Sequence, residues 1–148
     1  MSVSAGDTIR LLIADDQALV RGALGALLEL EPDLTVVGMA ADGAEAVRLA
    51  EELRPDVCLM DIQMPGMDGV EATRRIRQAS AGTRVLVVTT FARPGYLRSA
   101  LDAGASGFIV KDTPAEELAE AVRRVRSGLR VLDPVLADRP VAAIAARW

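Results

Sequence analysis

The chain has 148 residues and a formal net charge of −4, which suits one acidic domain and argues against a chain that itself binds nucleic acid or an anionic membrane. It is 51% hydrophobic but only 3% aromatic, so its core must be built from aliphatic side chains. The complete absence of histidine excludes histidine-based acid–base catalysis, a Ser-His-Asp triad and histidine metal ligands. The metal chemistry that remains is oxygen-ligated and favours Mg²⁺ or Ca²⁺ over zinc.

The sequence also predicts a cytoplasmic location and no membrane span. No apolar run approaches 18 residues, and residues 1–8 lack the apolar core of a signal peptide. The single cysteine, Cys58, lies inside an apolar run and is expected to be a buried structural thiol, which fits a reducing compartment.

Short apolar runs alternate with amphipathic stretches between residues 9 and 126. Val20, Leu24, Leu27 and Leu28, for example, recur at the spacing of one helix face. Five such strand–helix pairs predict an α/β fold with a parallel sheet covered on both faces and joined by right-handed crossovers. The expected strands are 9–14, 35–39, 57–60, 85–88 and 107–110, and the expected helices begin near residues 16, 42, 68, 94 and 114.

Two of the predicted helices have explicit start signals. Asp42-Gly43 opens the second helix, and Thr113-Pro114-Ala115-Glu116 has the pattern of a capping box. This pattern predicts Pro114 at the first helical position of the fifth helix.

Polar residues follow four of the predicted strands: Asp15 and Asp16, then Asp61, Thr89 and Lys111. The carboxyl ends of parallel strands share one edge, where open α/β sheets bind ligands, so these side chains are expected to meet. Three carboxylates in a small space need a hard cation such as Mg²⁺. The positive charge of Lys111 partly balances the negative charge of Asp61, and the Thr89 hydroxyl can donate a hydrogen bond to a phosphoryl oxygen. The group predicts a phosphoryl-transfer site with Asp61 as acceptor. Helix or loop capping by the acids, or a structural salt-bridge cluster, are the alternatives.

With these residues, the segment 9–126 resembles the receiver domain of two-component response regulators. The matching features are Asp15-Asp16, the segment Leu-Met-Asp-Ile-Gln-Met-Pro-Gly-Met-Asp-Gly around Asp61, Thr89-Thr90-Phe91, and Gly-Phe-Ile-Val-Lys111. The residues of these segments are similar to those of the NarL/FixJ (LuxR-type) subfamily. The resemblance implies a flavodoxin-like, CheY-like (βα)5 fold, a doubly wound five-stranded parallel sheet with strand order 2-1-3-4-5.

The resemblance also implies a mechanism. Asp61 would attack the phosphohistidine of a sensor histidine kinase and become an acyl phosphate, so the chain would be a signalling domain and not an enzyme. Slow self-dephosphorylation and Mg²⁺-dependent self-phosphorylation would accompany this role. Mg²⁺ would be held by Asp16, Asp61 and the backbone carbonyl of Gln63, and through water by Asp15.

Further roles carried over by resemblance concern switching and lifetime. Lys111 and Thr89 would hold phosphoryl oxygens, and Thr89 would shift while the ring of Phe108 turns inward; a plain core aromatic is the alternative for Phe108. Gln63 and Phe91 would tune the lifetime of the acyl phosphate. Many receivers have proline after the lysine, whereas this chain has Asp112, so a cis bond there is an open question.

The expected domain organisation is a tail at 1–8, the receiver at 9–126, and a linker or tail at 127–148. This subfamily normally carries a C-terminal helix-turn-helix, which 127–148 does not contain, so the chain is expected to be part of a longer transcription factor. DNA would be contacted only through that other domain. Phosphorylation is expected to produce a homodimer, through helices one and five or through helices four and five.

Two rival functions require residues that this chain lacks, and a third fits the sequence. A haloacid-dehalogenase-type phosphatase would want a second Asp at position 63, which is Gln. A flavodoxin-like cofactor binder would need a phosphate loop after the first strand, where Asp15-Asp16 would repel phosphate. A stand-alone or phosphate-independent receiver acting as a protein-interaction module remains open.

Overall fold

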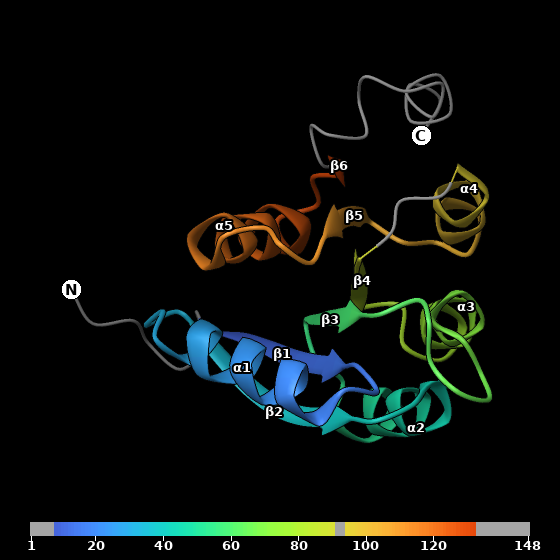
Figure 1. Ribbon diagram of the computed structural model, residues 1–148, viewed down its shortest axis with the longest axis horizontal. Helices are drawn as coiled ribbons and strands as arrows, with labels where there is room; N and C mark the ends of the chain where they lie inside the picture. Colours follow the sequence, from blue (N-terminus) through green and yellow to red (C-terminus); the bar gives the residue numbers. More distant parts are fainter. Residues whose placement is uncertain (1–7, 91–93, 133–148) are drawn as a thin grey trace.

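The computed structural model describes residues 8–90 and 94–132, and Figure 1 shows their arrangement. The strands are β1 (Ile9–Ala14), β2 (Leu34–Ala40), β3 (Val57–Met60), β4 (Arg84–Thr89), β5 (Gly107–Val110) and β6 (Val131–Leu132). The helices are α1 (Ala18–Glu29), α2 (Gly43–Leu53), α3 (Gly69–Ala79), α4 (Pro94–Asp102) and α5 (Ala115–Arg126). None of the helices in these ranges is long and apolar enough to cross a membrane.

The strands form one parallel sheet in the order β2-β1-β3-β4-β5-β6. The predicted α/β class and the order of the first five strands are confirmed. The prediction of five strands was incomplete, because β6 adds a sixth beside β5, with Gly107 opposite Val131. A two-residue strand is too short to produce a periodic signal in sequence.

Helices cover both faces of the sheet, as the predicted fold requires. Figure 1 shows α1 and α5 on one side and α2, α3 and α4 on the other. Alternation along β1 divides its side chains between two cores: Leu11 and Ile13 pack with α1 and α5, whereas Leu12 packs with the opposite helices. Both cores are mainly aliphatic, and the core that contains Leu12 also holds the fully buried ring of Phe108 and packs against Tyr96.

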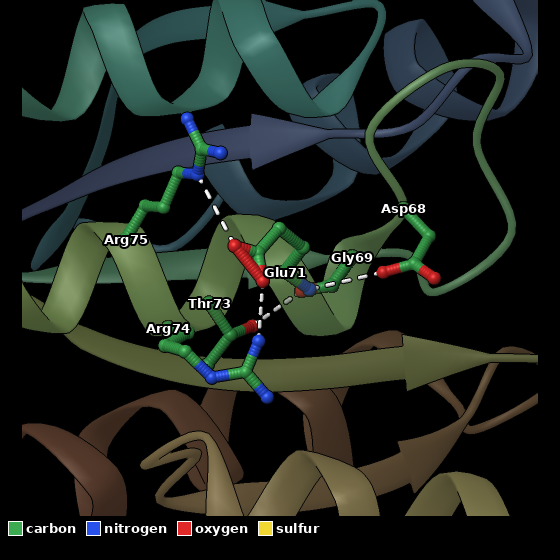
Figure 2. A network of polar contacts seen from close by, with 6 residues as sticks. All are labelled: Asp68, Gly69, Glu71, Thr73, Arg74 and Arg75. Atoms are coloured by element: carbon green, nitrogen blue, oxygen red, sulfur yellow. Dashed lines mark hydrogen bonds and ion pairs between the residues drawn. The ribbon is translucent and has the colours of Figure 1, made fainter.

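Local polar contacts set the start of α3, directly after the loop that follows β3 (Figure 2). The carboxylate of Asp68 accepts a hydrogen bond from the backbone N–H of Glu71 at 2.9 Å and caps the helix. The buried hydroxyl of Thr73 donates to the Gly69 carbonyl oxygen at 2.7 Å, and Glu71 accepts from Arg75 Nε at 3.2 Å. The Asp68 cap bond sets where the loop ends, and the other two bonds lie within the helix.

Two local predictions differ from the structure. Pro114 is the N-cap of α5 and has no side-chain cap bond, while the Thr113 hydroxyl donates to the Val110 carbonyl oxygen at 2.7 Å. The helix therefore begins one residue later than the capping-box pattern predicts. Leu27 is 46% exposed rather than buried, and Gly25 lies on the buried face instead. Apolar residues surround almost all of α1, so periodicity alone does not identify its buried face.

Candidate functional site

The sheet ladder brings the predicted site residues to one edge. The backbone N–H of Asp61 donates to the carbonyl oxygen of Ala14 at 3.0 Å, which places the end of β3 beside the end of β1. On the other side, the N–H of Lys111 donates to the Thr89 carbonyl oxygen at 2.8 Å. Hydrogen bonds of the backbone therefore extend the sheet by one residue and fix the Cα positions from which these side chains project.

Three carboxylates converge at this edge. One oxygen from each of Asp15, Asp16 and Asp61 lies within 4.8 Å of the other two. Asp15 and Asp61 are 2% and 6% exposed, whereas Asp16 is exposed to solvent. The ammonium of Lys111 lies between the two buried acids, with Nζ 2.7 Å from Asp15 Oδ2 and 3.4 Å from Asp61 Oδ2.

The charges in this cluster do not balance. Burial raises the pKa of Asp61, the Lys111 charge opposes this rise, and the charges of Asp15 and Asp16 add to it, so the net pKa is above its usual range. Burial lowers the pKa of Lys111, but its contacts with Asp15 and Asp61 outweigh that effect and leave it raised. Three carboxylates against one ammonium leave a formal excess of two negative charges. Oxygen ligands with that excess fit a divalent hard cation such as Mg²⁺.

The loop after β3 returns very close to the acidic cluster, and a glycine makes this possible. The N–H of Gly69 donates to the Ile62 carbonyl oxygen at 2.8 Å. A Cβ atom at position 69 would lie 2.1 Å from the backbone oxygen of Asp61. The sequence predicts that Gly69 ends the preceding strand and lies at the start of a helix. Its close approach to Asp61 depends on the path of the loop and carries no local sequence signal.

The remaining predicted residues occupy different environments. Thr89 is 2% exposed at the end of β4, and Phe108 lies fully buried on the adjacent strand, opposite Val87. Gln63 is exposed in the loop after Asp61, and Phe91 lies outside the described residues. The bond after Lys111 is trans, because the described residues contain no cis peptide bond.

Two contacts around Asp15 were not anticipated from sequence. The N–H of Gln17 donates to Asp15 Oδ1 at 2.9 Å, and the guanidinium of Arg21 donates to the Asp15 carbonyl oxygen at 2.7 Å. The available signal was a cation one helical turn inside α1, in an otherwise apolar stretch close to Asp15 and Asp16.

A doubly wound parallel sheet with an acidic cluster and a lysine at its carboxyl edge is the arrangement of a signalling receiver. Comparison with protein families agrees, since residues 11–123 match the response regulator receiver domain. The chain belongs to this family, as the sequence motifs predicted. Receiver domains are signalling domains rather than classical enzymes, and they bind Mg²⁺ at an acidic pocket.

Known relatives support the predicted subfamily. The chain is 46% identical over 130 residues to the transcriptional regulatory protein DesR of Bacillus subtilis, covering 88% of this chain and 64% of DesR. It is 42% identical over 127 residues to the response regulator VraR of Staphylococcus aureus, covering 86% of this chain and 61% of VraR. The chain thus spans less than two thirds of the length of these relatives.

Solved structures give the same result. A LuxR-family two-component response regulator from an Aurantimonas species superposes with a TM-score of 0.86 at 37% identity, covering 94% of this chain and 99% of the other. The receiver domain of the response regulator NarL from Mycobacterium tuberculosis gives a TM-score of 0.79 at 37% identity, covering 82% of this chain and 98% of the NarL domain. The resemblance to LuxR-type receivers is confirmed.

Proposed function

We propose that this chain is a phosphoacceptor receiver in which Asp61 takes a phosphoryl group from the phosphohistidine of a sensor histidine kinase. The observation that carries the proposal is the buried Asp61 carboxylate beside Lys111 within a cluster of acids. In the transfer, a carboxylate oxygen of Asp61 forms the new O–P bond while the N–P bond breaks, and the leaving imidazole keeps the electron pair of that bond.

The other residues of the edge have separate roles. Asp16, Asp61 and the backbone carbonyl of Gln63 would hold Mg²⁺ directly, and Asp15 would do so through water. When bound, this ion neutralises charge on the phosphoryl oxygens. Lys111 and Thr89 hold phosphoryl oxygens, which adds a second fixed positive charge and a neutral donor to the same group.

Phosphorylation then acts on a pre-existing conformational equilibrium. Thr89 shifts toward the phosphoryl group, and Phe108 on the neighbouring strand turns into the space that is left. Gln63 and Phe91 adjust how long the acyl phosphate survives. The packed state favoured by phosphate would form a homodimer.

The output of this switch is control of transcription through a DNA-binding domain separate from the receiver. Support comes from the names of the relatives, which are transcriptional regulators, and from the 64% of DesR that the chain spans. In this proposal residues 1–8 are a tail, 9–126 the receiver and 127–148 a linker whose residues Val131 and Leu132 pair with the receiver sheet, in a protein that works in the cytoplasm.

Intact mass spectrometry after incubation with Mg²⁺ and acetyl phosphate tests the proposal. Wild type should gain one phosphoryl mass, and Asp61→Ala should gain none. Asp112→Asn removes an exposed carboxylate near the same edge and should behave as wild type. A gain in Asp61→Ala would place the acceptor elsewhere. No gain in folded wild type, followed by none from a phosphorylated kinase, would favour a phosphate-independent interaction module.

A further inference from the structure

Arg21 reaches back from α1 to the loop that carries the acidic residues. Its Nη1 donates to the carbonyl oxygen of Asp15 at 2.7 Å, and its backbone N–H donates to the carbonyl oxygen of Gln17 at 2.9 Å. The side chain is half-buried, so the bond is partly shielded from water. The function proposed above gives this arginine no role.

The other bonds that hold the loop between β1 and α1 are made by Asp15. Its N–H donates to the Ala40 carbonyl oxygen at 3.0 Å, its Oδ1 accepts from the Gln17 N–H at 2.9 Å, and its Oδ2 lies 2.7 Å from Lys111 Nζ. Gln17 is the N-cap of α1 and makes no side-chain cap bond, and the first turn of the helix contains no acidic residue. The pairing of β1 with β2 ends at Ala14 and Ala40, so Asp16 lies beyond the ladder. The position of Asp16 therefore depends on how the loop is held.

A hydrogen bond to the Asp15 carbonyl group can control the path of this loop. This oxygen belongs to the planar peptide group that joins Asp15 to Asp16, so fixing the oxygen fixes the orientation of that plane. The orientation of the plane sets the direction in which the chain continues through Asp16. The bond from Arg21 thereby helps to bring the exposed carboxylate of Asp16 within reach of the two buried ones.

We propose that Arg21 is a positioning residue for divalent-cation binding, acting through the Asp15 carbonyl on the geometry of Asp15 and Asp16. This inference rests on the proposed function. The charge of Arg21 alone would oppose a second cation nearby, but the guanidinium is bound to a carbonyl oxygen and does not occupy a carboxylate oxygen of the cluster. Outer partners that orient metal ligands typically change metal affinity by tenfold or more.

Calorimetric titration of the full chain with Mg²⁺ tests this role. Arg21→Met should raise the Mg²⁺ dissociation constant by roughly tenfold, and Arg21→Lys, which keeps the charge and one donor, should raise it less. Arg77→Met is the matched control. Arg77 is also half-buried and donates to backbone carbonyl oxygens, those of Ala81 at 2.8 Å and Thr83 at 2.7 Å, but at the opposite edge of the sheet. It should lose thermal stability without a change in Mg²⁺ affinity.

The possible outcomes separate this role from its alternatives. Unchanged or tighter Mg²⁺ binding by Arg21→Met would overturn it, because the charge of the arginine would then outweigh its positioning. Equal weakening in Arg77→Met would also overturn it, because the cause would be general loss of stability. If Arg21→Met does not fold, Arg21→Lys decides by the same criteria. Wild type that binds no Mg²⁺ would refute the metal part of the proposed function together with this role, whereas binding that is insensitive to Arg21 would refute this role alone.

Discussion

Replacing Asp61 by Asn is expected to stabilise the metal-free protein at neutral pH. Burial is the largest cause that raises the pKa of Asp61, and the neighbouring acids add to it. A native pKa above the unfolded one means that ionisation of Asp61 opposes folding. Asn has nearly the same shape and no charge, so this unfavourable contribution disappears. Lys111 is not left without a partner, because its 2.7 Å contact with Asp15 remains.

The opposing charge interactions can be compared directly. At an effective dielectric constant of about 20, Lys111 and Asp61 at 3.4 Å attract by about 5 kcal/mol. Asp15 and Asp61, with oxygens within 4.8 Å, repel by at least about 3.5 kcal/mol on the same scale, and the exposed Asp16 adds a smaller, screened repulsion. The attraction and the repulsion nearly cancel, so the cost of desolvating Asp61 decides whether its replacement by Asn stabilises or destabilises the protein. The expected gain for Asp61→Asn is on the order of 1 kcal/mol.

Urea unfolding in EDTA at low salt measures this gain. The favourable contribution of protonated Asp61 is complete below the unfolded pKa, about 3.9, and is lost as pH rises through the raised native pKa. The advantage of Asp61→Asn should therefore be absent near pH 4 and present at pH 7. Asp42→Asn is the control, because Asp42 caps α2 through a side-chain oxygen that Asn retains, and it should change stability by less than about 0.5 kcal/mol. A variant less stable than wild type at pH 7, or an advantage that does not depend on pH, would refute the reasoning.

Three further substitutions probe other parts of the structure by the same unfolding assay. Lys111→Met should lower stability in EDTA by about 3 kcal/mol, because it leaves buried acids without their cation, and Mg²⁺ should restore part of the loss. Gly69→Ala should cost more than about 2 kcal/mol, since its Cβ would meet the Asp61 backbone oxygen at 2.1 Å; a neutral result would mean that the loop relaxes freely. Arg123→Met should cost about 1 kcal/mol at pH 7 after allowance for solvent screening. The Arg123 hydrogen bond lowers the pKa of Asp33, so that cost should vanish as pH falls through the lowered pKa, and a cost that persists in acid would point to lost packing.

The sequence predicted the architecture where local patterns and tertiary structure agree. The run Val57–Met60 is fully buried, as an apolar strand of a parallel sheet should be. It did not predict β6, because Val131 and Leu132 become a strand only through their position beside β5. That position depends on the turn at Gly128, which adopts φ +98°, and on the direction of α5. The sequence of two residues predicts neither the turn at Gly128 nor the direction of α5.

The candidate site was predictable to the extent that strand ends determine it. Asp15, Asp61 and Lys111 meet because parallel strands bring their carboxyl ends together, a rule that needs only the strand assignments. The roles of Arg21 and Gly69 could not be inferred in this way. The role of Arg21 depends on the reach of its long side chain across a loop, and the role of Gly69 depends on the path by which a loop returns to the sheet.

The acidic edge adjoins one of the two hydrophobic cores, because Ala14, Met60 and Ile62 flank the acids in the chain and belong to the core on the side of α2, α3 and α4. Both cores hold the sheet through completely buried side chains such as Leu11 and Leu12. The fold therefore does not require the cluster to be electrostatically favourable, and two buried acids can face a single ammonium. A ligand shifts a conformational equilibrium only by its differential interaction with the two states. An edge that retains excess negative charge and a raised Asp61 pKa has a large interaction available for a cation, and the β4–β5 ladder joins that edge to the buried Phe108. In the proposed function, a change of charge at Asp61 would alter the packing of Phe108, which lies on β5, two strands from β3 in the sheet, and inside the hydrophobic core.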